Sequence, residues 1–132
     1  MLGAKVVCIS NNIPSNPSHF ESLNLKKKII NKKIDIRNLE LLEKVFVKYK
    51  PDYVFHLVGQ SIVKKSFTDP IYTWQTNTIG TLNILESLRK LKKKCFVVLI
   101  TSDKSYKNTE IKRGYKENDI LGGHDPYSAS KA

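Results

Sequence analysis

The amino-acid sequence predicts an α/β fold in which helices cover both faces of a parallel sheet. Residues 4–10, 53–58 and 95–100 are apolar runs of strand length. Segments between these runs repeat apolar residues at helical spacing. Continuous apolar strands that alternate with helices are typical of a parallel sheet buried on both sides.

The first half of the chain predicts two strands and one helix. Residues 4–10 form the first strand, and residues 11–22 hold two prolines with several Ser and Asn, which indicates a loop. Residues 29–36 alternate weakly and predict a short strand that ends at Asp35. Asn38 is the expected N-cap of a helix that ends before Pro51. The apolar positions of this helix are Leu39, Leu42, Val45, Phe46 and Tyr49.

The second half predicts two strands and two helices. Residues 53–58 form a buried strand, and Asp69 with Pro70 opens a helix, because proline is favoured in a first helical turn. Residues 95–100 form the most apolar strand, a long polar loop covers residues 101–126, and Tyr127 begins the final helix. We interpret the apolar stripe of the helix after Pro70 as core packing; its members are Ile79, Leu82, Leu85, Leu88 and Leu91.

Composition indicates one domain of ordinary size. The chain has 132 residues, and 40% of them are hydrophobic, which is enough for a core. It contains no run of 18 apolar residues and no visible signal peptide, so we expect no membrane partner. The abrupt entry into a strand-like run after residue 4 suggests that an upstream part is missing.

The chain is strongly basic, with a formal net charge of +11. Its lysines form short clusters at element ends without interleaved aromatic residues, which favours a solvated surface. Attraction of an anionic nucleotide sugar is a second interpretation, and RNA binding is a third. Cys8 and Cys95 have no short-range partners, so we expect buried reduced thiols, no metal site and a cytoplasmic protein.

Three chemically rich segments follow predicted strands: Ser10 and the residues after it, residues 59–61, and residues 101–104. Parallel α/β sheets bind their ligands at the carboxyl ends of the strands. The shared placement of these segments therefore predicts a functional site at this edge.

Tyr127 and Lys131 form a candidate proton-transfer pair. They are four residues apart, so on a helix they share one face. A neighbouring ammonium favours the phenolate over the phenol, and such a pair can act as a base near neutral pH. The spacing alone favours a solvated helix turn. Its context, after an apolar strand, a Ser-Asp-Lys turn and a Gly-Gly-His-Asp-Pro loop, favours an active site.

With the strands placed, the chain resembles the extended short-chain dehydrogenase/reductase family of nucleotide-sugar enzymes. The resemblance is carried by FHLVGQ, NTIGT, TSDK and YSASK. Within that family the chain is most similar to the CDP-glucose 4,6-dehydratase branch, through GYKENDILGGHDPYSASKA at residues 114–132 and QSIVKKSFTDPIYTWQTNTIGT at residues 60–81.

This resemblance implies a Rossmann-type doubly wound sheet, bound NAD and a homodimer when full length. It implies a hydro-lyase that converts CDP-glucose to CDP-4-keto-6-deoxyglucose and water, and it implies no nucleic-acid partner. The product would feed deoxy sugars of bacterial surface polysaccharides such as lipopolysaccharide O-antigen.

The resemblance also implies catalytic roles. Tyr127 matches the base that removes the proton of the sugar 4-hydroxyl, and Lys131 matches the residue that supports it and bonds the nicotinamide ribose. Ser102 takes the place of the residue that hydrogen-bonds the sugar 4-oxygen. Lys104 matches the base for the C5 proton, and Asp103 matches the acid for the departing 6-hydroxyl. Without the resemblance, a plain turn at a strand end is the favoured interpretation of Asp103 and Lys104.

Further positions match binding residues of the family. Asp35 resembles the acid that meets the adenine amino group, and Asn77 resembles a structural Asn that bonds the backbone of the central strand. His56 is expected to be a packed, hydrogen-bonded histidine, and Gly59 with Gln60 is equally compatible with a plain turn. The implied substrate-binding residues are Gln60, Ser102 and His124. The implied cofactor-binding residues are Asp35, Ile36, Leu57, Val58, Gly59, Thr101, Tyr127 and Lys131.

Two features depart from the family pattern. A Gly-rich phosphate-binding turn should precede the first strand and is absent, and Ser10-Asn11-Asn12 stands where an acidic ribose ligand is expected. We therefore expect residues 1–132 to be a partial NAD-binding domain, truncated at both ends and inactive alone. The first strand and the C-terminal substrate region would be missing. Alternatives are another nucleotide-sugar dehydratase or epimerase, or a non-catalytic basic remnant that binds RNA or nothing.

Overall fold

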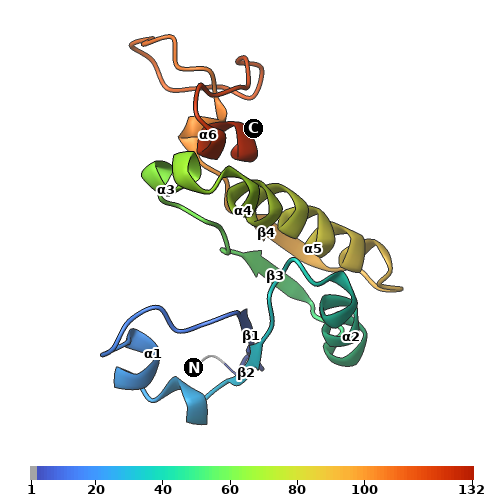
Figure 1. Ribbon diagram of the computed structural model, residues 1–132. Helices are drawn as coiled ribbons and strands as arrows, with labels where there is room; N and C mark the ends of the chain where they lie inside the picture. The colour runs from blue at the N-terminus through green and yellow to red at the C-terminus, as the bar shows by residue number, and fades with distance from the viewer. Residues whose placement is uncertain (1–2) are drawn as a thin grey trace.

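The computed structural model of the protein describes residues 3–132. Strand β1 (Val7–Ser10) pairs in parallel with β2 (Ile30–Lys33), and strand β3 (Tyr53–His56) pairs in parallel with β4 (Phe96–Leu99). The predicted parallel direction is confirmed for both pairs. They form two separate two-stranded sheets (Figure 1), and no strand of the described part joins them.

Helix α2 (Leu39–Tyr49) follows the prediction at both ends. The Oδ1 atom of Asn38 accepts a hydrogen bond of 3.0 Å from the backbone N–H of Leu41, which caps the first turn. Lys50 ends the helix with a φ of 42°, a left-handed conformation that is common at helix ends, immediately before Pro51.

The loop predicted for residues 11–22 is wrong at its end, because α1 (His19–Ser22) forms there. This helix consists of four residues and is followed by a 3₁₀ turn, η1 (Leu25–Lys27). Ser18 caps α1: its Oγ accepts the N–H of Glu21 and donates to the Glu21 carboxylate. A local cap therefore produces helix where Ser, Asn and Pro suggested an open loop.

The helical segment opened by Pro70 is interrupted by one π turn. It consists of α4 (Pro70–Trp74), a π turn η2 (Gln75–Ile79) and α5 (Gly80–Arg89). Asp69 caps it as predicted, accepting the N–H of Tyr72 at 3.1 Å. A short helix α3 (Val63–Thr68) precedes it. The chain ends with a 3₁₀ turn η3 (Asp103–Ser105), a long excursion and helix α6 (Pro126–Lys131).

The buried core lies where α2 and α5 pack against each other. Its members are Ile36, Leu42, Phe46 and Ile84, with Leu42 fully enclosed. Val54 and Val58 pack against this cluster from β3 and the residues that follow it. One face of the β3–β4 sheet is therefore covered by helices.

The other face of this sheet is exposed, so the prediction that helices cover both faces is wrong for the described residues. The side chains of Tyr53, Phe55 and Phe96 are 63%, 64% and 67% exposed, because no described element packs on them. Burial on one face explains why a strand that is apolar throughout has alternating exposure. Cys8 and Cys95 are likewise only half-buried, and both are free.

The predicted packing face of α5 is also wrong. Ile79, Leu82 and Leu85 are exposed, and only Leu88 and Leu91 of the predicted stripe pack against the core. The face that packs on the chain after β2 instead carries small and polar residues. A Cβ on Gly80 would lie 2.5 Å from Cδ1 of Ile36, and Asn83 Nδ2 donates to the Ile36 carbonyl at 3.0 Å. Close approach therefore selects glycine and asparagine over leucine.

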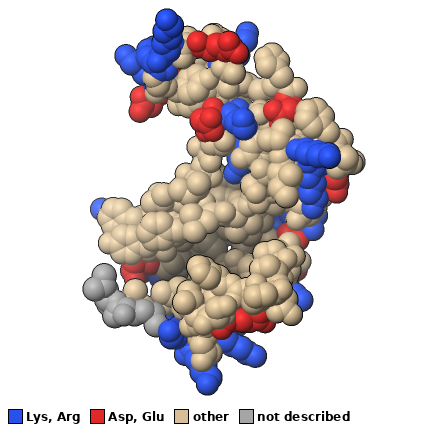
Figure 2. Space-filling view, turned by 90° about the vertical axis from the view of Figure 1, so that its left-hand side faces the viewer, with Lys and Arg blue, Asp and Glu red and all other residues tan. Residues whose placement is uncertain are grey.

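The surface in Figure 2 is hollowed between the two ends of the molecule, and most of the wall of the hollow is uncharged, with acidic and basic groups at its upper edge. Lys and Arg side chains lie in separate groups near the periphery of this face. No helix within residues 3–132 combines the length and the apolar character needed to cross a membrane.

Candidate active site

Helix α6 occupies a position where four other elements meet. It packs against α3, α4, η2 and η3 (Figure 1). Asp125 caps it: Oδ1 accepts the N–H of Ser128 at 2.9 Å, and Oδ2 accepts the hydroxyl of Ser128 at 2.5 Å. Pro126 takes the first helical position, as the helix geometry favours. These signals start the helix so that Tyr127 is buried, with 8% of its surface exposed.

Gly123 brings the preceding loop against this helix. A Cβ at Gly123 would lie 2.0 Å from Cβ of Ser128 and 3.0 Å from its Cα. Any side chain at Gly123 would therefore have to move the first turn of α6. The loop before α6 therefore packs directly on the helical turn that carries Tyr127.

Asn77 links the exit of β3 to α6. Its Oδ1 accepts the N–H of Gln60 at 2.8 Å, and its Nδ2 donates to the Gln60 carbonyl at 3.1 Å. The same Nδ2 donates to Oγ of Ser130 at 2.9 Å. Asn77 bonds the backbone as expected, but at Gln60, after β3 has ended at His56, and not within the strand itself. The bond to Ser130, which the sequence did not suggest, joins this clamp to the turn that carries Lys131.

Lys131 points toward the backbone after β3. A Cβ on Gly59 would lie 3.2 Å from Nζ of Lys131 and 3.3 Å from Oδ1 of Asn77, so any larger residue would press on both groups. Burial lowers the pKa of Lys131 below its ordinary value. Within residues 3–132 the Lys131 ammonium has no carboxylate partner within ion-pair distance. An ammonium held this way is suited to bond hydroxyl groups of a ligand.

The turn after β4 lies beside α6. Oγ of Ser102 accepts the N–H of Lys104 at 3.2 Å and donates to Oδ1 of Asp103 at 3.1 Å. Asp103 and Lys104 are exposed. The pKa of Asp125 lies below its ordinary value: burial would raise it, but the bonds from Ser128 and Tyr127 and the charge of Lys104 lower it more. The structure therefore brings the Ser-Asp-Lys turn and the Tyr-Lys helix together.

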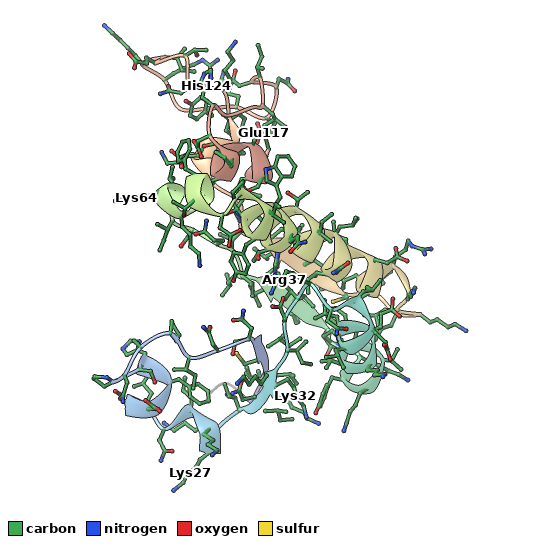
Figure 3. All side chains as sticks on the ribbon, in the orientation of Figure 1. Lys27, Lys32, Arg37, Lys64, Glu117 and His124 are labelled. Atoms are coloured by element: carbon green, nitrogen blue, oxygen red, sulfur yellow. The ribbon has the colours of Figure 1, made fainter. Side chains whose placement is uncertain are left out.

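The predicted adenine-binding residue Asp35 lies after β2 and is paired. Arg37 donates to it from Nε at 3.0 Å and from a terminal nitrogen at 2.7 Å, and this fork lowers the pKa of Asp35. The guanidinium lies 4.9 Å from the ring centre of Tyr72, and Figure 3 places Arg37 near the middle of the molecule. A cavity of about 590 Å³ here is lined by Asp35, Arg37, Asn38, Leu39, Gln75 and Ile79. Arg37 follows directly after the matched Asp-Ile pair but was not predicted.

The other predicted binding residues are distributed as follows. Ile36 is buried in the core, and Val58 packs against it, whereas Leu57 and Thr101 are exposed at strand ends. The side chain of Gln60 is buried: Nε2 donates to Thr73 and to the Ile62 carbonyl, and Oε1 accepts the N–H of Ile62. His124 is exposed in the loop before α6 (Figure 3).

The excursion between η3 and α6 is ordered by its own contacts. The rings of Tyr106 and Tyr115 stack with centroids 4.7 Å apart, and Tyr106 bridges to Leu121. Arg113 donates two bonds of 2.7 Å to the carboxylate of Asp119, whose pKa falls to about 2. No group of three or more His, Cys, Asp or Glu in residues 3–132 is placed to hold a metal ion.

Comparison with known proteins gives consistent relatives. A family model described as GDP-mannose 4,6 dehydratase matches residues 2–132. A CDP-glucose 4,6-dehydratase of Salmonella typhimurium is 41% identical over 130 residues, which is 98% of this chain and 36% of that protein.

Solved structures agree on the fold. A UDP-glucose 4-epimerase from Thermotoga maritima, solved with UDP-glucose, matches with a TM-score of 0.83 and 26% identity. A UDP-glucose 4-epimerase from Thermus thermophilus, in complex with NAD, matches with a TM-score of 0.76 and 26% identity. Each match covers 98% of this chain and 40% of the other.

Proposed function

Because the chain belongs to the family described as GDP-mannose 4,6 dehydratase, we propose that it is the catalytic part of a nucleotide-sugar 4,6-dehydratase that acts on CDP-glucose. The predicted α/β fold of Rossmann type is confirmed by the epimerase structures. The observation that carries the proposal is the seating of the Tyr127–Lys131 helix against the Ser102–Lys104 turn. The chain spans 36% of the length of the Salmonella relative, so the activity is proposed for a protein that contains it.

The proposed roles follow from the family resemblance. Tyr127 removes the proton of the sugar 4-hydroxyl, and Ser102 hydrogen-bonds the same oxygen. Lys131 supports Tyr127 through its positive charge. Lys104 then takes the C5 proton, which a neighbouring 4-ketone makes acidic, and Asp103 gives a proton to the departing 6-hydroxyl as water leaves. The exposure of Asp103 and Lys104 supports these roles, because both side chains are free to meet a substrate.

The residues present fit NAD. The glycine at position 59 leaves the Lys131 ammonium open to ribose hydroxyls. Asp35 borders a cavity that could take an adenine, although Arg37 already holds its carboxylate, so an adenine amino group would share that carboxylate with Arg37. NAD would supply a reversible hydride acceptor, so that sugar oxidation and later reduction leave the cofactor unchanged. The backbone at residues 57–59 and Thr101 would form the edge against which it lies. The Thermus relative, solved with NAD, supports this assignment.

We further propose that the full-length protein forms a homodimer, is cytoplasmic and has neither a nucleic-acid nor a membrane partner. Ile71 and Trp74 project from α4, and Leu82 and Leu85 project from α5, as exposed apolar side chains. Such a stripe is typical of a helix that packs on another helix. The product would serve as a precursor of deoxy sugars.

The test uses a chimera in which this chain replaces the matching part of the Salmonella relative. Purified chimera is incubated separately with CDP-glucose, dTDP-glucose and UDP-N-acetylglucosamine, and products are separated by mass and retention. We expect a product lighter than CDP-glucose by one water. A product of unchanged mass with an inverted hydroxyl would instead identify an epimerase. No product, while the unmodified Salmonella enzyme is active, would contradict the proposal.

The chimera also separates the redox steps from elimination. Asp103→Asn with Lys104→Ala should slow loss of water more than reduction of NAD, because both residues act after the 4-hydroxyl is oxidised. Single-turnover absorbance at the NADH band should therefore show reduced cofactor accumulating. Lys107→Ala, on the next exposed lysine of the same loop, is the control and should show no accumulation. Normal product formation by the double variant would show that Asp103 and Lys104 only form a turn at the strand end and take no part in elimination.

The close packing of Gly123 against α6 gives a further prediction. Gly123→Ala in the chimera should lower the free energy of unfolding by about 1–3 kcal/mol, the usual range for an overpacked site. Turnover should fall with it, because the first turn of α6 must shift. Gly114→Ala is the matched control, since a Cβ there meets nothing within 4 Å. Thermal unfolding and steady-state turnover measure both effects, and equal behaviour of the two variants would contradict the prediction.

A further inference from the structure

The π turn η2 lies in the helix directly at the Asn77 clamp. Turns of this kind are rare inside α-helices and often occur at functional sites. Thr81 lies in the first turn of α5 directly after it, and its Oγ1 lies 2.6 Å from the carbonyl oxygen of Asn77 within the π turn. A carbonyl can only accept, so the hydroxyl proton of Thr81 is directed at Asn77.

His56 contacts the same hydroxyl from β3. Its ring is buried, with 5% of its surface exposed, and Nε2 lies 2.9 Å from Oγ1 of Thr81. Because the only proton of that hydroxyl already goes to Asn77, Oγ1 must accept the bond from His56. The geometry therefore assigns the tautomer: His56 carries its proton on Nε2.

The surroundings of His56 favour an uncharged ring. Burial and the positive charge of Lys131 both lower the pKa of His56. A neutral histidine still donates to Thr81 but does not repel the Lys131 ammonium. A permanently positive side chain in its place would both cost desolvation and oppose that ammonium.

We propose that His56 and Thr81 are positioning residues of the active site, which act through Asn77 on Lys131. The chain of contacts runs from His56 through Thr81 to the Asn77 carbonyl, and from the Asn77 amide to Gln60 and Ser130. Ser130 precedes Lys131 on α6. The inference rests on the proposed function, because it gives these two side chains a role in the reaction of the same site.

The first experiment measures the tautomer. The chimera is labelled with ¹⁵N at histidine, and the His56 signals are assigned from their loss in His56→Gln. We expect a neutral ring protonated on Nε2 at pH 7. A proton on Nδ1, or a charged ring at pH 7, would overturn the proposal. This measurement does not depend on turnover. It therefore tests the hydrogen bond between His56 and Thr81 even if the chimera has another activity.

The second experiment measures the effect on catalysis. Thr81→Val removes the hydroxyl, and Thr81→Ser keeps it. We expect Thr81→Val to lower kcat about 10- to 100-fold with little change in KM, since a small displacement of a reacting group costs about this much. Thr81→Ser should remain within a few-fold of the unmodified chimera. His56→Leu should behave like Thr81→Val, and His56→Gln, which retains an N–H donor, should restore most of kcat.

Ser87→Ala is the matched control. Ser87 is buried on the same helix and donates to the carbonyl of Asn83, the same i to i−4 bond as that of Thr81, but away from the active site. Its loss should lower stability without lowering kcat. Equal kcat losses in Thr81→Val and Ser87→Ala would reduce Thr81 to a structural residue. An unchanged kcat in Thr81→Val, or failure of Thr81→Ser to retain activity, would also overturn the proposal.

Discussion

Tyr127→Phe in the chimera is expected to lower turnover of CDP-glucose at least about 10²-fold, the usual effect of removing an acid–base group. The substitution keeps the buried ring and removes only the ionisable oxygen. The loss should appear in kcat more than in KM, because the missing proton transfer belongs to the reaction and not to binding. Steady-state kinetics on the purified variant provide the measurement.

Tyr49→Phe is the matched control for this result. Tyr49 lies at the end of α2, away from α6, so loss of its hydroxyl should leave kcat unchanged. Thermal unfolding of both variants checks that the fold is retained. Turnover of Tyr127→Phe equal to that of Tyr49→Phe would remove Tyr127 from the mechanism.

The 132-residue chain on its own is expected to show no NAD binding by calorimetry, poor solubility and no turnover of CDP-glucose. Its strands form two separate two-stranded sheets, and one face of β3 and β4 exposes large apolar side chains. Two-stranded sheets are marginal in water, and exposed apolar faces of this kind favour association. The chain also lacks the Gly-rich turn on which pyrophosphate binding in this fold depends.

The chimera is the comparison for this prediction. It supplies the segments of the Salmonella relative that flank the matched region, and it should bind NAD and remain soluble. Saturable NAD binding by the 132-residue chain alone would show that residues 3–132 already form a sufficient cofactor site. If neither protein binds NAD, the proposed cofactor-binding residues are wrong.

Local chemistry determined where most elements begin and end. Asn38 and Asp69 were readable because caps and first-turn prolines act within three or four residues, and the structure has helices at both. The final helix begins at Pro126, one residue before the predicted start at Tyr127. The parallel direction of the strands also followed from the sequence, since helices alternate with apolar runs. The Tyr127–Lys131 pair and the Ser102–Lys104 turn were predicted because short motifs carry them.

Only the tertiary structure decided which surfaces meet. The sequence favoured the leucines of α5 as its packing face, but the close approach of the helix to Ile36 requires Gly80 and Asn83 there. Covered and exposed faces of β3 could not be told apart, because apolar side chains occur on both. Burial depends on neighbours that are distant in sequence, and the sequence of a single strand does not show which elements will pack on it.

The same limit applied to the site. Asn77, Gln60 and Ser130 are joined by hydrogen bonds across separations of 17 and 53 residues, and the bond between His56 and Thr81 spans 25. Single polar residues in strands and helices look alike whether they face solvent or one another. The sequence by itself therefore determined the element ends and the reactive motifs, which depend on near neighbours. Only the tertiary structure determined the hydrogen bonds of Asn77 that hold those motifs together. A hydrogen bond forms only where the packed backbone brings donor and acceptor within about 3 Å.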